Sequence, residues 1–252
     1  MNRYCLLIPH YNHERQLLGF LPQLLSVGLP LLLVDDGSSP ESLAQLQAAL
    51  DEHRQNSANP PVHLFAMHVN RGKGSAVKNG LVFARNLGFT HCIQIDADGQ
   101  HSVADIPRFI AVSDAKPDAL VSGRPVFDDS APKARLYGRK VTDVFVALET
   151  LSLRIKDSLC GYRVYPLTQM EALLDHYYIG PRMDFDTEMM VKSVWMGVEV
   201  EFIDTAVIYP EQSVSHFHYL RDNLLLIRLH SRLLLGMLWH SPVILWRRLR
   251  GR

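Results

Sequence analysis

The sequence contains little cysteine. Cys5, Cys92 and Cys160 are the three cysteines among 252 residues, and they are widely spaced. An odd number without a C-x-x-C pair excludes a disulfide framework and a cysteine-based zinc site. Cys5 and Cys92 lie in apolar runs, where cysteine usually acts as a small buried hydrophobic residue. We therefore expect a reducing, cytoplasmic environment.

Long hydrophobic runs are also missing. No stretch reaches about 18 apolar residues, the length that a membrane-spanning helix requires. The apolar run before Pro9 is too short for the core of a signal peptide. Neither a spanning helix nor a secretory leader is therefore expected.

The chain has no overall excess of one charge, because 26 Lys and Arg residues balance 26 Asp and Glu residues. Proteins that bind nucleic acid are usually basic, so we expect no nucleic-acid partner. The charge is nevertheless uneven. Residues 221–252 contain seven arginines and one acidic residue, Asp222, which gives this tail +6 and the remainder −6.

What the sequence does contain is an alternation of short apolar runs and helical patterns. Hydrophobic residues make up 47% and charged residues 21%, an ordinary globular composition. The alternation predicts an α/β domain with a mostly parallel central sheet covered by helices on both faces. The predicted strands cover residues 4–8, 31–34, 62–67, 92–95 and 119–121. The predicted helices cover residues 14–27 (interrupted by Pro22), 41–54, 74–88, 104–115 and about 134–155.

We expect a single domain over residues 1–218 and an amphipathic helical tail over 219–252. The tail is rich in leucine, with Arg228 and Arg232 on one helical face. The segment between Arg232 and Arg247 would span roughly 21 Å as a helix, too short to cross a bilayer. Tryptophan beside arginine in the last residues is typical of a membrane surface, so we expect a peripheral protein on the cytoplasmic face. Alternatively, 224–238 packs back on the domain.

Polar or glycine-rich residues follow every predicted strand. Parallel sheets bind ligands at the carboxyl ends of their strands. We therefore expect one polar crevice at this edge of the sheet. The segments that would line it are 9–12, 35–39, 70–74, 96–101 and 122–124.

Asp96 and Asp98 form the sharpest motif. Two carboxylates two residues apart at a strand end can share Mg²⁺ or Mn²⁺, which prefers oxygen ligands and leaves positions open for phosphates. A solvated acidic turn is the alternative. Asp36, in Asp35-Asp36-Gly37, can contact a nucleotide base or belong to a plain turn.

The glycine-rich segment 70–75 can bind an anion at a helix start, and Lys73 in this segment is a candidate for contact with the substrate that supplies the anion. It is not a P-loop, because His68 and Gly74 replace the required glycine and Ser or Thr. No G-x-G-x-x-G follows the first strand, which argues against a dinucleotide-binding dehydrogenase.

A second set of candidate residues comes later in the chain. Asp186 and Glu188 begin a predicted helix, where acids also favour the helix dipole. Four arginines could line the site, although Arg135 or Arg139 taken alone is better explained as a solvated surface residue. The arginines are Arg124, Arg135, Arg139 and Arg163.

Taken in order, these motifs resemble the signature of inverting family-2 glycosyltransferases with a GT-A fold. The similarity is greatest to the branch of dolichyl- and polyprenyl-phosphate sugar synthases and runs from Pro9 to about Tyr209. It is carried by Pro9-His10-Tyr11-Asn12, Asp35-Asp36-Gly37-Ser38, Asn70-Arg71-Gly72-Lys73-Gly74, Asp96-Ala97-Asp98-Gly99-Gln100-His101, Ser122-Gly123-Arg124 and Asp157 to Arg163.

The resemblance implies a nucleotide-sugar donor, a lipid-linked acceptor and roles for individual residues. Asp96 and Asp98 would hold the metal and the diphosphate, and Gln100 would face the sugar or the acceptor. Arg124 and Arg163 would stabilise phosphates, and Asp186 or Glu188 would lie near the acceptor. Pro9, Tyr11, Asn12 and Asp36 would hold the nucleoside, while Arg135, Arg139 and Asp157 would lie on the acceptor side.

The sequence departs from that branch after the last strands. Its usual Arg-x-x-Gly-x-Ser-Lys segment is replaced by residues 211–218, where His216 or His218 could face the metal or the acceptor. The expected reaction is direct displacement with inversion. A hydroxyl acceptor would need Asp186 or Glu188 as a base, whereas a lipid phosphate would need none. A sugar nucleotidyltransferase and a non-catalytic nucleotide-sugar scaffold are the alternatives.

Overall fold

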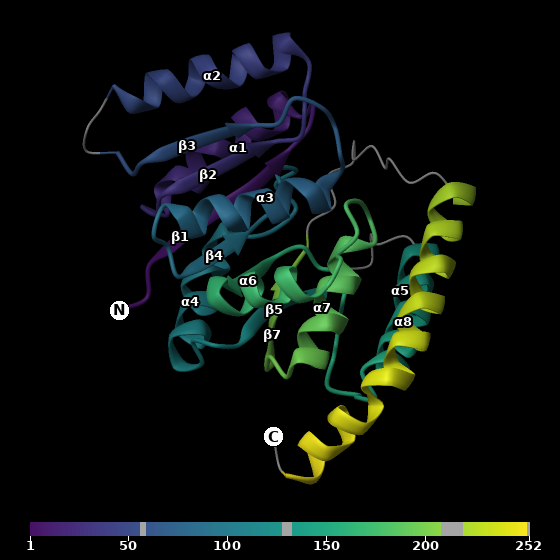
Figure 1. Ribbon diagram of the computed structural model, residues 1–252. Helices are drawn as coiled ribbons and strands as arrows, with labels where there is room; N and C mark the ends of the chain where they lie inside the picture. Colours follow the sequence, from purple (N-terminus) through teal and green to yellow (C-terminus); the bar gives the residue numbers. More distant parts are fainter. Residues whose placement is uncertain (56–58, 128–132, 208–218, 251–252) are drawn as a thin grey trace.

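The computed structural model describes residues 1–55, 59–127, 133–207 and 219–250. In this part of the chain a seven-stranded sheet runs through the molecule in the order β3-β2-β1-β4-β6-β5-β7 (Figure 1). Neighbouring strands are parallel except where β6 pairs with β4 and with β5. The strands are β1 (Tyr4–His10), β2 (Leu31–Asp35), β3 (Val62–Ala66), β4 (His91–Gln94), β5 (Leu120–Val126), β6 (Arg163–Pro166) and β7 (Val200–Ala206).

The prediction of a mostly parallel sheet is confirmed, and its five strands are present. β6 and β7 were not predicted, because neither is a continuous apolar run. β6 is four residues long and begins with an arginine. β7 is the last strand of the sheet and carries Glu201, Asp204 and Thr205 among its apolar residues.

Helices cover both faces of the sheet (Figure 1). In β1, Leu6 and Ile8 join the hydrophobic cluster of one face and Cys5 and Leu7 that of the other. Strands buried on both faces need such continuous apolar sequences. The first face carries α1 (Glu14–Ser26), α2 (Pro40–Arg54) and α4 (Ile106–Ala115), which follows the short η1 (Val103–Asp105). The second carries α3 (Lys73–Asn86), α6 (Leu167–His176) and α7 (Phe185–Met196). α1 continues through Pro22 without starting late.

Two further helices, α5 (Lys133–Glu149) and α8 (Tyr219–Leu249), form a layer outside α7. They run side by side at one edge of the molecule (Figure 1). Their shared cluster includes Val146, Val191, Trp195 and Leu233. The buried His230 of α8 also contacts a carboxylate oxygen of Glu149 in α5 at 2.7 Å. The alternative that the first half of the tail packs back on the domain is therefore correct.

α8 continues through Pro242. Proline cannot donate a backbone hydrogen bond, which would leave the carbonyl of Leu238 without its helical partner. The hydroxyl of Ser241 donates to that carbonyl at 2.9 Å and replaces the missing bond. Across the described ranges, no helix combines the length and apolar character needed to span a membrane.

Candidate active site

The loops after β1 and β2 are tied together by side chains. Asp35 accepts a hydrogen bond from the backbone N–H of Ser38 (3.0 Å) and contacts the buried His10 ring at 2.9 Å. The backbone N–H of Asn12 donates to Ser38, and its side-chain oxygen accepts from Ser39, both at 2.9 Å. Asn12 adopts φ 48°, a left-handed conformation that asparagine tolerates better than most residues. Asn12 thus positions the predicted nucleoside pocket, and its contact with a donor stays a prediction.

Asp36 organises the next loop. Its carboxylate accepts hydrogen bonds from the backbone of Arg71 (2.8 Å) and Gly72 (2.7 Å) and from the Asn70 amide (3.0 Å). Burial raises the pKa of Asp36 despite these bonds. Gly37 has φ 74°, and a Cβ there would lie 2.5 Å from the Asn70 nitrogen. Asp36 therefore holds the anion-binding loop in place from inside the protein.

Three charged side chains lie together in what we call the Lys73 cluster, which consists of Lys73, Asp96 and Asp186. Lys73 lies at the start of α3, Asp96 follows β4, and Asp186 lies at the start of α7. The Lys73 ammonium lies 2.9 Å from Asp96 and 3.5 Å from Asp186. Burial opposes its charge, but the two carboxylates raise the pKa of Lys73 above its ordinary value. Gly161 makes room for the cluster, because a Cβ there would lie 2.7 Å from the Lys73 nitrogen and 2.9 Å from Asp96.

Asp98 stands exposed beside this cluster. Although the residue keeps exposed surface, the surrounding protein partly desolvates its carboxylate group. This desolvation and the nearby Asp96 raise the pKa of Asp98 to about 6. Its carboxylate also accepts the backbone N–H of Gln100 at 3.0 Å, which shapes the turn. In the described part of the chain, the buried nitrogen Nδ1 of His101 and the buried oxygen Oδ1 of Asp186 have no hydrogen-bond partner. Polar atoms so placed are available to a ligand.

These observations fit a divalent cation at Asp96 and Asp98. A cation would stabilise the ionised form of both acids, which otherwise repel each other. Within the described ranges, no three His, Cys, Asp or Glu side chains converge to hold a metal on their own. Mg²⁺ and Mn²⁺ suit such a site, because substrate phosphates complete their coordination.

Asp186 and Glu188 have different surroundings although they are neighbours on α7. Asp186 points one oxygen at Lys73. Glu188 is fully buried and accepts the backbone N–H of Gly180 (2.7 Å), Lys192 (2.6 Å) and Arg232 (2.8 Å). Its oxygens are therefore occupied. The expectation that Glu188 faces the acceptor is not met in this structure, and Asp186 remains the candidate.

Arg163 was expected to contact phosphates, but it has no exposed surface. Its terminal nitrogens donate to the carbonyls of Asp186 and Ser158, each at 2.8 Å. This guanidinium therefore fixes the start of α7 from within the protein. The expected phosphate contact is corrected to a positioning role. A single arginine in a short strand could not reveal this from sequence, because its partners are backbone carbonyls, which any residue carries, and that of Asp186 is 23 residues away.

Two other predicted arginines, Arg124 and Arg139, also have protein partners. Arg124 is exposed and forms a two-point ion pair with Asp204 of β7, with one N···O distance of 2.6 Å. Arg139 pairs with the buried Asp157, which also accepts the N–H groups of Leu159 (2.9 Å) and Cys160 (2.7 Å). Arg124 therefore pairs with a carboxylate at the edge of the sheet. Arg139 and Asp157 instead shape the loop that brings Gly161 to the Lys73 cluster.

Five other predicted positions remain. Tyr11 is 43% exposed at the end of β1, and Pro9 lies within that strand. The side chain of Arg135 lies outside the described residues, as do His216 and His218. Their roles stay predictions.

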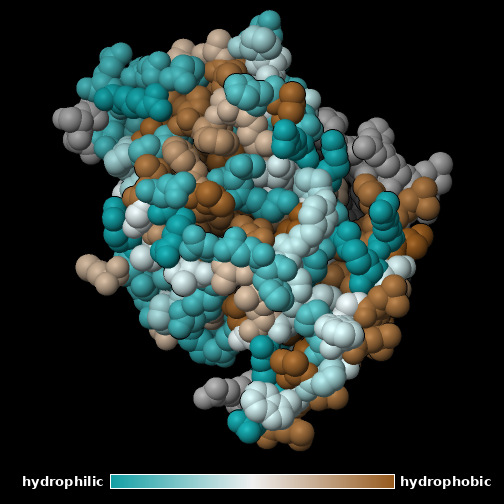
Figure 2. Space-filling model, viewed as in Figure 1, coloured by the Kyte–Doolittle hydropathy of each residue, from teal (hydrophilic) through white to brown (hydrophobic). Residues whose placement is uncertain are grey.

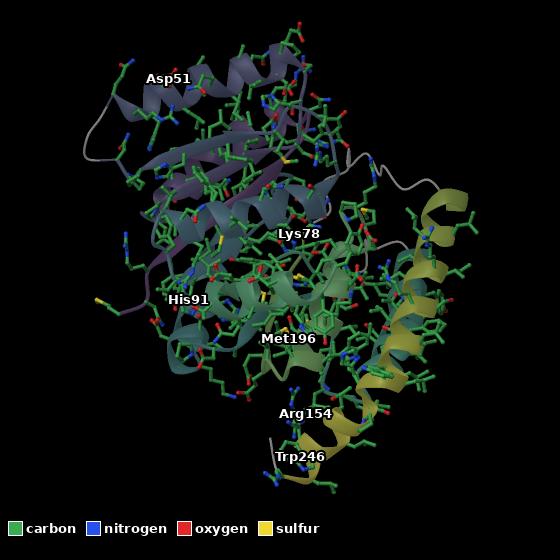
Figure 3. The ribbon with its side chains drawn as sticks, in the orientation of Figure 1. Asp51, Lys78, His91, Arg154, Met196 and Trp246 are labelled. Atoms are coloured by element: carbon green, nitrogen blue, oxygen red, sulfur yellow. The ribbon has the colours of Figure 1, made fainter. Side chains whose placement is uncertain are left out.

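Sequence reasoning missed Gln94 and Tyr165, which lie behind Asp96. Gln94 is fully buried in β4, accepts from the Tyr165 hydroxyl at 3.1 Å and donates to Asp96 at 3.4 Å. A glutamine in an otherwise apolar strand was the available signal, since a buried amide needs partners. Lys78 was also missed. It reaches from α3 to the carbonyl of Ile179 ahead of α7 (Figure 3).

This sheet, with its loops and acidic pair at the carboxyl edge, is the arrangement that the resemblance to glycosyltransferases of the GT-A fold implied. Residues 5–166 match the model of Glycosyl transferase family 2. The chain belongs to this family and is an enzyme that transfers sugars. The alternatives of a nucleotidyltransferase and a non-catalytic scaffold are thereby set aside.

Curated relatives extend over most of the chain. A dolichyl-phosphate beta-glucosyltransferase of Dictyostelium discoideum is 25% identical over 257 residues, covering 92% of this chain and 75% of the relative. An undecaprenyl-phosphate 4-deoxy-4-formamido-L-arabinose transferase of Pseudomonas fluorescens is 31% identical over 180 residues, covering 67% of this chain. The aligned part is 48% of that relative, so the chain matches about half of its length.

Solved structures show the same fold. Glucosyl-3-phosphoglycerate synthase of Mycobacterium tuberculosis with UDP has a TM-score of 0.63 and 14% identity, covering 94% of this chain and 80% of that one. The same enzyme with Mn²⁺, UDP and glucosyl-3-phosphoglycerate has a TM-score of 0.60, with 94% and 78% covered. At this identity the likeness concerns the fold alone.

Proposed function

We propose that the protein transfers a sugar from a nucleoside diphosphate sugar to a polyprenyl phosphate, with inversion at the anomeric carbon and with Mg²⁺ or Mn²⁺. The names of the dolichyl- and undecaprenyl-phosphate relatives support this acceptor class. The observation that carries the proposal is that the carboxylates of both candidate bases already contact protein donors. Protein donors occupy both oxygens of Glu188, whereas Asp186 has one oxygen paired with Lys73 and one without a partner among the described residues. This favours an acceptor that needs no base.

The donor side is built around the diphosphate. Asp96 and Asp98 would hold the cation, which would neutralise the charge that develops on the departing nucleoside diphosphate. Lys73 supplies a positive charge beside them that does not depend on the cation. The loop held by Asp36 starts α3, whose N-terminus attracts phosphate.

The acceptor side needs a positive charge more than a base. A phosphate monoester is already ionised at neutral pH, so its oxygen can attack without losing a proton. Asp186 then acts as a positioning residue that holds Lys73 between donor and acceptor. A hydroxyl acceptor would instead require Asp186 to take its proton.

The chemical step is a single displacement. An acceptor phosphate oxygen forms a bond to the anomeric carbon, while the bond from that carbon to the diphosphate oxygen breaks. The electron pair of the broken bond leaves with the nucleoside diphosphate, and the configuration at the anomeric carbon is inverted. Because a polyprenyl phosphate lies in a membrane, the proposal also places the protein peripherally on the cytoplasmic face.

The test uses purified protein with UDP-, GDP- and dTDP-sugars, a short-chain polyprenyl phosphate and the matching polyprenol, with Mn²⁺ or EDTA. We expect transfer to the phosphate only, loss of transfer in EDTA, and an inverted product by NMR. Asp186→Asn should retain measurable transfer, with turnover lowered by about tenfold through loosened positioning of Lys73.

The matched control is Asp175→Asn, which changes an exposed acid on α6. It should behave as wild type. Transfer to the polyprenol, abolished in Asp186→Asn but kept in Asp175→Asn, would contradict the phosphate acceptor and make Asp186 the base. Retained activity in EDTA would contradict the metal.

A further inference from the structure

Exposed hydrophobic side chains are concentrated on α5 and α8. Among the described residues, thirteen of the twenty-one exposed large hydrophobic side chains lie on these two helices. Figure 2 shows hydrophobic side chains along the edge formed by α8, at the right of the view. On α5 they are Tyr137, Val141, Val144 and Leu148, and on α8 they are Leu224, Ile227, Leu235, Leu238, Trp239, Val243, Leu245, Trp246 and Leu249.

The exposed residues form one stripe on each helix. Tyr137, Val141, Val144 and Leu148 recur every three or four positions, which places them on one face of α5. On α8 the exposed residues fall within about half of the helix circumference, with a gap between Ile227 and Leu235. They extend over most of its 31 residues, about 46 Å of helix. We call these two stripes together the α5–α8 face.

Both stripes point away from the domain. The opposite sides of the two helices are buried on α7, through Val146 of α5 and Leu229 and Leu233 of α8 packed with Val191 and Trp195. Because both helices rest on the same third helix, their free sides lie on a common outer surface. Monomeric soluble proteins rarely leave so long an apolar surface uncovered.

The charge of this face selects what covers it. From Asn223 to Arg252 the sequence has no Asp or Glu, while Arg228 on α8 and Arg250 directly after it are exposed. Arg250 lies over the ring of Trp246, 4.0 Å from its centre, on the last turns of α8 (Figure 3). Of the two acids of α5, Glu149 is buried with His230. Asp143 is half-buried, and burial and the nearby Asp157 raise its pKa to about 6. The face is therefore apolar and basic.

We propose that the α5–α8 face is a docking surface for a bilayer that contains anionic lipids. Apolar side chains with tryptophan and arginine are the composition that inserts at the headgroup boundary. A second copy is the less favourable occupant, since a twofold interface would bring this basic face against itself. The proposal assigns to two helices, one of them inside the domain sequence, what the sequence suggested for the last residues alone.

The face is connected to the catalytic site. Arg232 of α8 binds Glu188, two residues from Asp186, and Arg139 of α5 binds Asp157. A bilayer on this face would therefore lie beside the acceptor half of the site. This consequence rests on the proposed lipid acceptor, whereas membrane binding itself does not.

The test compares vesicles of phosphatidylcholine with vesicles of equal parts phosphatidylcholine and phosphatidylglycerol, in a flotation assay at low and high salt. The full chain should float with the anionic vesicles and less so at high salt. Val141→Glu with Val144→Glu on α5, and separately Trp239→Glu with Trp246→Glu on α8, should each lower vesicle binding by about tenfold or more.

The matched control is Val82→Glu, which changes a similarly exposed valine on α3 outside the face (54% exposed, against 63% for Val144). It should bind vesicles as wild type. Circular dichroism and thermal unfolding must show that every variant folds. No flotation of the full chain, or α5 variants that bind as wild type, would overturn the proposal. A concentration-dependent dimer by sedimentation, lost in the same variants, would identify a second copy instead.

Activity assays separate this proposal from the proposed function. Variants of the face should keep transfer to a short, water-soluble polyprenyl phosphate and lose transfer to a long-chain acceptor in vesicles. If wild-type protein floats with anionic vesicles but transfers to no polyprenyl phosphate, the acceptor assignment fails and the docking surface stands.

Discussion

The two halves of the site hold their acidic residues in different ways. In the first half, Asp36 accepts hydrogen bonds mainly from loop backbone close to the strand ends, and Asp35 accepts the backbone N–H of Ser38 beside contacts with side chains. In the second half, Glu188 is balanced by Lys192 and Arg232, and the buried Arg163 holds the start of α7. The first half is thus built from strand-end loops, and the second from buried charges brought together by packing.

This difference has consequences for function and stability. Backbone donors cannot be removed by a side-chain change, so the donor half should tolerate substitution around it. Buried charges are stable only while each keeps its partner, and loss of one partner leaves the other unpaired. The Lys73 cluster joins the two halves, because Lys73 and Asp96 come from the first and Asp186 from the second.

The largest effect is expected in the donor half. Asp98→Asn should lower transfer by at least about a hundredfold, because half of the proposed cation site is lost. The fold should be unaffected, since Asp98 is exposed. Turnover with saturating donor and Mn²⁺, together with thermal unfolding, measures both. Transfer at the wild-type rate would remove Asp98 from the site.

The second half should instead respond in stability. Glu188→Gln should lower the free energy of unfolding by about 3 kcal/mol, because it leaves the buried Lys192 without its counter-charge. Arg232→Gln is the matched change of the partly exposed partner and should cost about 1 kcal/mol or less. Urea unfolding of both variants decides this. Equal costs would show that Glu188 is not held as a buried charge.

The smallest expected effect is a pH dependence of the donor half. The pKa of Asp98 is raised to about 6, so its carboxyl group is mostly protonated at lower pH. A cation must then displace this proton, and its apparent affinity should fall by about tenfold for each pH unit below 6. Calorimetric titration with Mn²⁺ tests this, with Asp98→Asn as the control that should lack the dependence.

The stability of the metal-free protein should change in the opposite direction. Because folding raises the pKa of Asp98 from its ordinary value of 3.8, its protonated form contributes stability below that value. This contribution is lost as the pH rises through about 6. Urea unfolding of metal-free wild type and Asp98→Asn at several pH values measures this contribution. If Asp98 stabilised the fold more at high pH than at low pH, the raised pKa would be contradicted.

Much of the donor half could be predicted from sequence. Parallel strands end at one edge of a sheet, so Asp36, Lys73, Asp96 and Asp98 had to lie near one another once their strands were identified. Their separate tasks were harder to foresee. Asp36 was expected at a base, yet its oxygens hold the loop of residues 70–72.

The acceptor half was less predictable, because its partners are far apart in the chain. Nothing local distinguishes Asp186 from Glu188, which both begin α7. Arg232, 44 residues later, makes the difference by reaching Glu188 from α8. The burial of Arg163 was likewise hidden, since β6 is antiparallel to its neighbours and too short to show a pattern.

The sequence by itself determined the class of the fold, the edge at which the site lies and the acidic pair for a cation. These follow from local apolar runs, from turn residues and from the direction of parallel strands. Tertiary structure alone decided that Asp186 keeps an oxygen without a partner among the described residues and that Arg163 is buried. It also decided which face of α8 is exposed. Those properties depend on the packing of α5, α7 and α8, and packing sets the burial and the partners of each charge.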